Sequence, residues 1–90
     1  MEIELRFFAN FREAVGQKTI HREFEDDFRV GDILRALPEE FPGMDLFEGE
    51  ELRQYITILR NGQDIEHING LETTIEDGDE LSVFPPVAGG

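Results

Sequence analysis

The chain has 90 residues and no cysteine. It is therefore expected to form one small domain without disulfides, thiolate metal ligands or a cysteine nucleophile. Acidic residues outnumber basic residues by 21 to 8, which gives a formal net charge of −13. This charge argues against nucleic acid and anionic membranes as partners, and it indicates adaptation to a salty cytoplasm, where ions screen the repulsion between like charges.

The first strand is predicted over residues 2–9, where apolar and charged residues alternate. This alternation differs from the continuous apolar run of a secretory signal, and nowhere is there an apolar stretch long enough to span a bilayer. We therefore expect a cytoplasmic protein. The core-facing residues of this strand are Ile3, Leu5 and Phe7.

A short helix is predicted over residues 11–15. Asn10 is placed to cap its start, Glu13 occupies the reciprocal capping position, and Gly16 follows as a terminator. Residues 18–24 alternate again and predict a second strand. The two strands are expected to pair as a hairpin.

The main helix is predicted over residues 31–37, because apolar residues recur there at helical spacing. Pro38 either ends this helix or starts a further turn through residues 39–41. Residues 42–54 show no clear period, so we expect an irregular connection with one short turn that fills part of the core. Arg29, just before the helix, lacks the side-chain acceptor of a good cap.

A second hairpin is predicted after this connection. Residues 55–60 predict a strand, and Asn61-Gly62 is the strongest hairpin signal in the chain, because a type I′ turn needs two residues that tolerate positive φ. A short partner strand is expected over residues 63–67. Asp77-Gly78-Asp79 then predicts a tight turn into a last strand over residues 80–84.

Together these elements predict an α+β domain of the β-grasp type over residues 1–84, with a mixed sheet of four to five strands and one main helix packed across it. Pro85 and Pro86 end the sheet because proline donates no ladder hydrogen bond. Residues 85–90 are expected to form a separate tail. The predicted core consists of Ile3, Leu5, Phe7, Ile20, Val30, Ile33, Leu34, Leu37, Ile56, Ile58, Leu71, Leu81 and Val83.

The tail ends in Gly89-Gly90, which follows Pro85-Pro86 and two small residues. Prolines favour an extended conformation that projects the chain away from the domain. Glycine has no Cβ, so a diglycine end can enter a narrow channel in another protein. The alternative is an ordinary frayed terminus. The pattern favours a terminal carboxylate that reacts inside a partner enzyme.

The C-terminal FPPVAGG is the most specific of several segments that occur in a familiar order. The weaker matches lie at residues 5–9, 11–13, 15–16, 30–34, 58–62 and 77–80. Together they resemble the MoaD-type small sulfur-carrier subunit of molybdopterin synthase and the small archaeal ubiquitin-like modifier proteins. The resemblance extends over nearly the whole chain.

This resemblance implies that an E1-like enzyme adenylates Gly90 with ATP and magnesium, while this chain binds no cofactor and is not itself an enzyme. Sulfur transfer then gives a thiocarboxylate for the molybdopterin synthase large subunit, or the activated end is joined to lysines of target proteins. Gly89 is the second glycine, and the free carrier is expected to be a monomer. The residues that would position the tail are Pro85, Pro86, Val87 and Ala88.

The surface that would face partners is expected on the side of the sheet away from the main helix. Phe8 and Phe84 alternate toward that side, where they form either an exposed apolar docking patch or a pair buried under a loop. The resemblance adds Leu59 to this surface. Lys18 is the sole lysine, so it is the only side-chain acceptor if copies of the chain become linked to one another.

Other chemistry finds little support in the residues. His21 and His67 lie in different elements without the spacing of metal ligands, so no metal site is expected. Three uses of the domain stay open: sulfur donation, covalent protein modification, and passive interaction through a ubiquitin-like domain whose tail has no chemistry. Deletion of Gly89-Gly90 distinguishes the third use, because a passive interaction domain would keep all its partners without these two residues.

Overall fold

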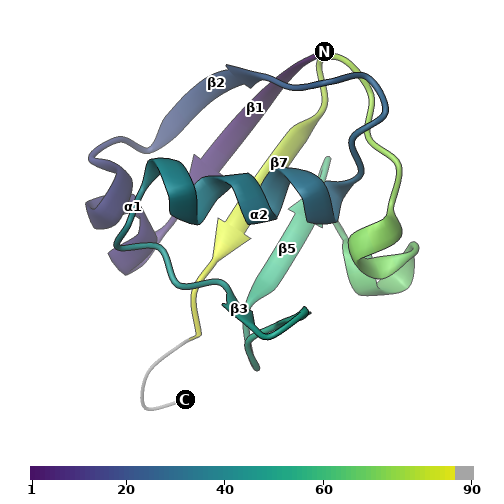
Figure 1. The fold of residues 1–90 in the computed structure, drawn as a ribbon. Helices are drawn as coiled ribbons and strands as arrows, with labels where there is room; N and C mark the ends of the chain where they lie inside the picture. Colours follow the sequence, from purple (N-terminus) through teal and green to yellow (C-terminus); the bar gives the residue numbers. More distant parts are fainter. Residues whose placement is uncertain (87–90) are drawn as a thin grey trace.

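The computed structural model describes residues 1–86, which form a five-stranded sheet crossed on one face by a long helix (Figure 1). The sheet order is β2-β1-β7-β5-β6, in which β1 and β7 run parallel and the other neighbours run antiparallel. This is the mixed sheet of the predicted β-grasp fold. Its strands are β1 (Glu2–Phe7), β2 (Thr19–Glu23), β5 (Thr57–Arg60), β6 (Gln63–Asp64) and β7 (Glu80–Phe84).

The remaining elements surround this sheet. The long helix that packs across it is α2 (Val30–Glu40), and a short helix, α1 (Ala9–Val15), lies beyond the end of β1 (Figure 1). The connection predicted as irregular contains a small two-stranded sheet of β3 (Phe47–Glu48) and β4 (Glu51–Leu52). Two single turns of 3-10 helix, η1 (Ile65–His67) and η2 (Gly70–Glu72), separate β6 from β7.

The core lies between α2 and the sheet, as the alternation predicted. Most of the predicted core residues are buried, whereas Ile56 and Leu71 are only partly buried and pack at its margin. The core also contains residues outside the predicted set, and several of these come from segments without hydrophobic periodicity. The additional members are Phe11, Met44, Leu46, Ile65 and Ile75.

The cap of α1 differs from the expectation, whereas the lack of a side-chain cap from Arg29 at α2 agrees with it. The N-cap of α1 is Phe8, which makes no side-chain cap, so the prediction that Asn10 caps this helix was wrong. Gly16 does end α1, with φ of 85°. At α2 the N-cap Arg29 has no side-chain acceptor, but Asp32 accepts the Arg29 backbone N–H at 2.8 Å, which supplies one half of a capping box.

The long helix continues through Pro38, so of the two alternatives the further turn is the one that forms. Pro38 lies in the final turn, and the ladder resumes when the Phe41 N–H donates to the Leu37 carbonyl oxygen at 2.8 Å. Near the start of the helix, Gly31 packs against η2. A Cβ on Gly31 would lie 2.9 Å from the Leu71 carbonyl oxygen, so this close approach requires glycine.

The second hairpin forms at the predicted turn. Asn61 and Gly62 have φ of 48° and 85°, as a type I′ turn requires, and Arg60 pairs with Gln63. The flanking strands are shorter than predicted. β5 begins only at Thr57, and the partner strand gives way to η1 after Asp64.

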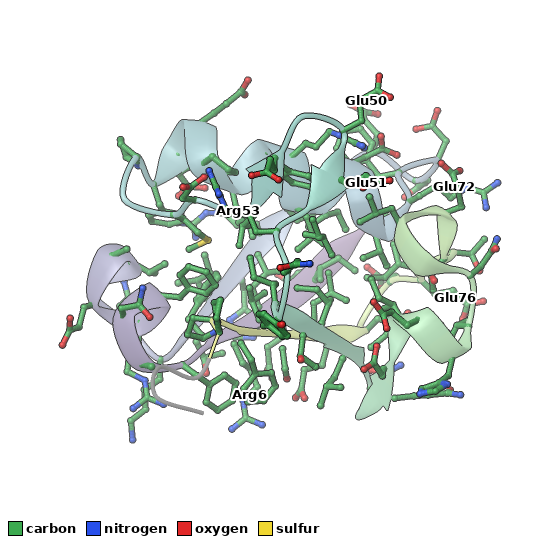
Figure 2. The ribbon with its side chains drawn as sticks, turned by 90° about the horizontal axis from the view of Figure 1, so that it is seen from below. Arg6, Glu50, Glu51, Arg53, Glu72 and Glu76 are labelled. Atoms are coloured by element: carbon green, nitrogen blue, oxygen red, sulfur yellow. The ribbon has the colours of Figure 1, made fainter. Side chains whose placement is uncertain are left out.

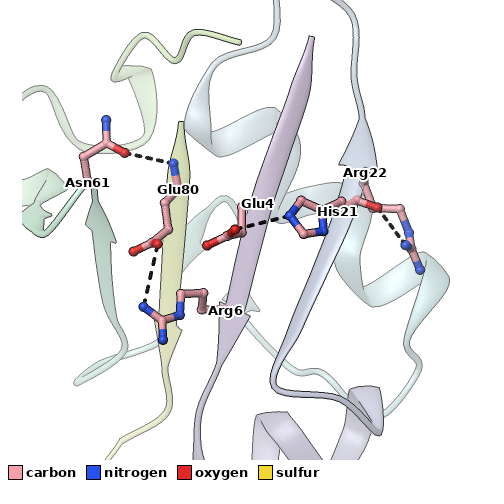
Figure 3. Close-up of polar contacts among 6 residues, drawn as sticks. All are labelled: Glu4, Arg6, His21, Arg22, Asn61 and Glu80. Atoms are coloured by element: carbon pink, nitrogen blue, oxygen red, sulfur yellow. Dashed lines mark hydrogen bonds and ion pairs between the residues drawn. The ribbon is translucent and has the colours of Figure 1, made fainter. Parts of the chain in front are cut away.

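A buried carboxylate ties this hairpin turn to the start of β7. Asp79 accepts hydrogen bonds from Arg60 Nε at 2.8 Å, Asn61 Nδ2 at 2.9 Å and the Glu76 backbone N–H at 2.8 Å. Burial alone would raise the pKa of Asp79, but these donors outweigh it and hold the pKa below its usual value. Asn61 also accepts the Glu80 backbone N–H at 2.9 Å (Figure 3).

Candidate functional site

The face of the sheet away from α2 is divided into two surfaces. The half of this face near the starts of β1 and β7 carries charged pairs between neighbouring strands. Arg6 lies 3.7 Å from Glu80, and His21 lies 3.2 Å from Glu4 (Figure 3). Figure 2 shows Arg6 projecting on the side opposite α2. These side chains are 33–57% exposed, so the ion pairs are expected to contribute little to stability.

The other half of this face is apolar. The rings of Phe8 and Phe84 stack with their centroids 4.1 Å apart and their planes within 10°. Leu59, from the neighbouring strand β5, is half-buried on the same groove. We call this feature the tail-base groove; it is open, has a volume of about 790 Å³, and is lined by Phe8, Ala9, Asn10, Glu13, Tyr55, Thr57, Leu59, Phe84, Pro85 and Pro86.

Strand direction explains why these residues meet. β1 and β7 are parallel, with Phe7 opposite Val83, so the next residues, Phe8 and Phe84, lie side by side at the same end of the sheet. The antiparallel register of β5 and β7 then places Thr57 opposite Phe84. Arg12 of α1 lies 5.7 Å from the centre of the Phe8 ring, so the outer side of the stack is partly covered by a cation.

The groove lies at the end of β7, where the predicted tail would begin. Pro85 is buried and Pro86 is exposed, and both line the groove. β7 ends at Phe84, directly before Pro85, so the prediction that the sheet ends at these prolines is confirmed. The predicted tail residues Val87, Ala88, Gly89 and Gly90 lie outside the described residues.

The other predicted site residues lie apart from the groove. Lys18 is exposed just before β2, and its carbonyl oxygen accepts the Phe7 N–H at 2.8 Å, which places it at the same end of the sheet as the tail-base groove. His21 faces Glu4, whereas His67 is exposed in η1. Within residues 1–86, no cluster of three or more His, Asp or Glu side chains is arranged to hold a metal ion, and no helix is long and apolar enough to cross a membrane.

Tyr55 is the groove residue that sequence reasoning placed elsewhere. It was assigned to a strand, but it lies in a turn before β5 with φ of 68°, and 80% of its side chain is exposed. An available signal was its polar surroundings, since Arg53 and Gln54 precede it without a strand-like alternation. The groove thus presents aromatic and aliphatic side chains, so its chemistry suits contact with an apolar protein surface.

Comparison with known proteins extends along the whole chain. The ThiS family model matches residues 5–90. The chain is 51% identical to small archaeal modifier protein 3 of the halophilic archaeon Haloferax volcanii over 100% of both chains. It is 31% identical to the molybdopterin synthase sulfur carrier subunit of Haemophilus influenzae over 98% of this chain and 99% of that one.

The structural comparison agrees with the sequence comparison. The crystal structure of SAMP1 from Haloferax volcanii matches with a TM-score of 0.85 and 35% identity, and the match covers 100% of both chains. The fold is thus the ubiquitin-like β-grasp fold that the order of elements predicted. The chain belongs to the ThiS family.

Proposed function

We propose that this chain is a ubiquitin-like carrier whose Gly90 carboxylate is activated by an E1-like enzyme and then passed on. The observation that carries the proposal is the family match, which runs from residue 5 through Gly90 and so includes the diglycine end. Relatives that the chain covers over nearly their full length are a small archaeal modifier and a sulfur carrier subunit. These two names correspond to the two possible fates of the activated carboxylate, which are attachment to a protein and conversion to a thiocarboxylate.

The chemistry needs little from the domain itself. A free carboxylate is a poor acyl donor because its leaving group is poor. The E1-like enzyme, with ATP and magnesium, joins AMP to the carboxylate and releases pyrophosphate. A sulfide donor then displaces AMP to give a thiocarboxylate, or a target lysine amine displaces it to give an isopeptide bond.

The domain would deliver Gly90 into the partner's active site. Pro85 and Pro86 border the tail-base groove, which supports a role in aiming residues 87–90 outward from a docked domain. Phe8, Leu59 and Phe84 would contact the partner. We assign this carrier to the cytoplasm, as a monomer that meets the E1-like enzyme, the molybdopterin synthase large subunit and target proteins in turn.

Intact mass spectrometry of the chain purified from its host tests the proposal directly. We expect a species in which one oxygen is replaced by sulfur, and its disappearance when the host lacks the E1-like enzyme. The matched control is the chain without Gly90, which should fold normally and never gain sulfur. An unmodified end in every preparation, together with no host lysine that carries the C-terminal peptide of this chain, would leave only the passive interaction domain.

If copies of the chain become linked to one another through a side chain, Lys18 is the only acceptor in this sequence. Lys18→Arg keeps the charge of this exposed residue and should abolish linked copies without a change in stability. Gel analysis under reducing, denaturing conditions measures this. Linked copies that persist in Lys18→Arg would contradict the assignment.

A further inference from the structure

Tyr55 occupies a backbone position that suits another residue. It is the third residue of a tight turn over Arg53–Ile56, in which the Ile56 N–H donates to the Arg53 carbonyl oxygen at 3.4 Å. Its φ is 68°. That conformation at the third turn position favours glycine or asparagine, and a bulky side chain there is strained.

No stabilising contact of the Tyr55 side chain within residues 1–86 offsets this strain. The Tyr55 side chain is 80% exposed, and within residues 1–86 it takes part in no hydrogen bond, ion pair or ring stacking. An exposed aromatic residue on strained backbone is a local conflict between sequence and fold, and such conflicts concentrate at functional sites. Tyr55 is therefore a candidate for contact with another molecule.

The location of the backbone strain supports this. Three non-glycine residues have positive φ in residues 1–86: Ala9, Tyr55 and Asn61. Asn61 belongs to the type I′ turn, where positive φ is required. The other two, Ala9 and Tyr55, both line the tail-base groove.

The length of the tail limits what can cover the groove. Residues 87–90 span at most about 14 Å when fully extended. An enzyme that holds Gly90 in its active site must therefore lie close against Pro86, which itself lines the groove. Because adenylation is common to both fates of Gly90, the E1-like activating enzyme is the occupant that the proposed function requires.

We propose that Tyr55 is a specificity-determining contact for this E1-like enzyme, and this proposal rests on the proposed function. The ring enters an apolar recess of the enzyme while the Phe8–Phe84 stack and Leu59 are covered beside it. A tyrosine combines a rigid apolar ring with a polar tip, so the recess should offer a hydrogen-bond partner to the phenol. The carrier's net charge of −13 favours a basic rim around that recess.

Steady-state kinetics of AMP transfer by the host's E1-like enzyme test the contact. Tyr55→Gly removes the ring and suits the positive φ, so the variant should fold at least as well as the natural chain. We expect its KM as carrier substrate to rise about tenfold with kcat unchanged, the size typical of an interface anchor. Tyr55→Phe should retain most of the affinity. Ile68→Ala is the matched control, because Ile68 is exposed at 39% and does not line the groove.

A direct readout is available because Tyr55 is the only tyrosine in the chain. Replacing it with fluorotyrosine gives one fluorine resonance in the carrier, and this resonance reports on the surroundings of residue 55 alone. We expect that resonance to shift or broaden when the enzyme is added. A purely structural role for Tyr55 would not produce this response.

The outcomes separate the two proposals. A raised KM for Tyr55→Gly with a fluorine response supports the contact. An unchanged KM for Tyr55→Gly, while the natural chain is adenylated, overturns the contact and leaves the proposed function intact. Failure of the enzyme to adenylate the natural, folded chain overturns the proposed function and the contact with it.

Discussion

Phe7 and Phe8 are neighbours in the sequence, yet they show how differently the two faces of the sheet are built. Phe7 is fully buried under α2 and meets the Phe41 ring edge-on at 6.3 Å. Phe8 lies on the other face, half-buried in a stack with Phe84 at the base of the tail. The helix-covered face is filled by residues of this chain, whereas among residues 1–86 nothing covers the apolar surface on the open face. If the proposed function holds, stability and partner recognition lie on opposite faces, and we expect that each can be changed separately.

The largest effect is expected on the covered face. Phe7→Ala removes a fully buried ring and should lower the free energy of unfolding by about 4 kcal/mol. Because small domains are stable by only about 5–15 kcal/mol, this variant should be close to unfolding. Chemical denaturation at a fixed salt concentration measures the loss. A loss below about 1 kcal/mol would show that the covered face is not the stabilising one.

Asp79 tests the connection between the second hairpin and β7. Asp79→Asn leaves the partly buried Arg60 without its carboxylate, and we expect a loss of about 2 kcal/mol. Asn61→Gly is the matched control, because it keeps positive φ and the Arg60 pair but removes the Asn61 side-chain bonds. Its loss should be smaller than that of Asp79→Asn.

The pH dependence of stability follows from the same carboxylate. The pKa of Asp79 is lowered in the folded state, so its contribution is complete above the unfolded pKa of about 3.9. It is lost as the pH falls through the lower folded value. The natural chain should therefore lose stability in acid more steeply than Asp79→Asn does. Parallel acid unfolding curves would contradict this assignment.

Gly31 tests the close contact between α2 and η2. Gly31→Ala places a Cβ 2.9 Å from the Leu71 carbonyl oxygen, and the required shift should cost about 1–2 kcal/mol despite the better helix propensity of alanine. Ala36→Gly in the same helix provides a comparison for propensity alone. A more stable Gly31→Ala variant would show that η2 moves freely.

The smallest effect on stability is expected on the open face. Phe8→Ala removes the stack with Phe84 and should cost about 1 kcal/mol. Its effect on adenylation should be much larger than its effect on folding. Phe7→Ala provides the opposite pattern, provided that activity is compared at a salt concentration where both variants are folded.

The covered face was predictable because its signals are local. Ile3, Leu5 and Phe7 alternate, the residues of α2 recur at helical spacing, and Asn61-Gly62 specifies its own turn. Met44 and Ile75 belong to the same core, but they lie in connections without a period, so only the three-dimensional arrangement identifies them. Ile65 is also in the core, but it lies in η1 and not in the strand that was predicted there. The Asp79 connection was not foreseen either, because its partners come from two separate turns.

The candidate site was predictable only in part. Alternation directed Phe8 and Phe84 to the open face, and parallel pairing of β1 with β7 then brought the two rings into contact. Tyr55 escaped notice because its turn contains no glycine, which is the residue that usually marks positive φ. A non-glycine residue at positive φ is strained, and because the turn contains no glycine the sequence did not indicate that conformation.

Hydrogen–deuterium exchange of the carrier, with and without the E1-like enzyme, would show which face of the sheet the partner covers. We predict slower exchange at the start of α1, in the turn that holds Tyr55 and at the end of β7, with α2 and β2 unchanged. Protection of α2 or of the free edge of β2, with none around the tail-base groove, would contradict the division between the two faces.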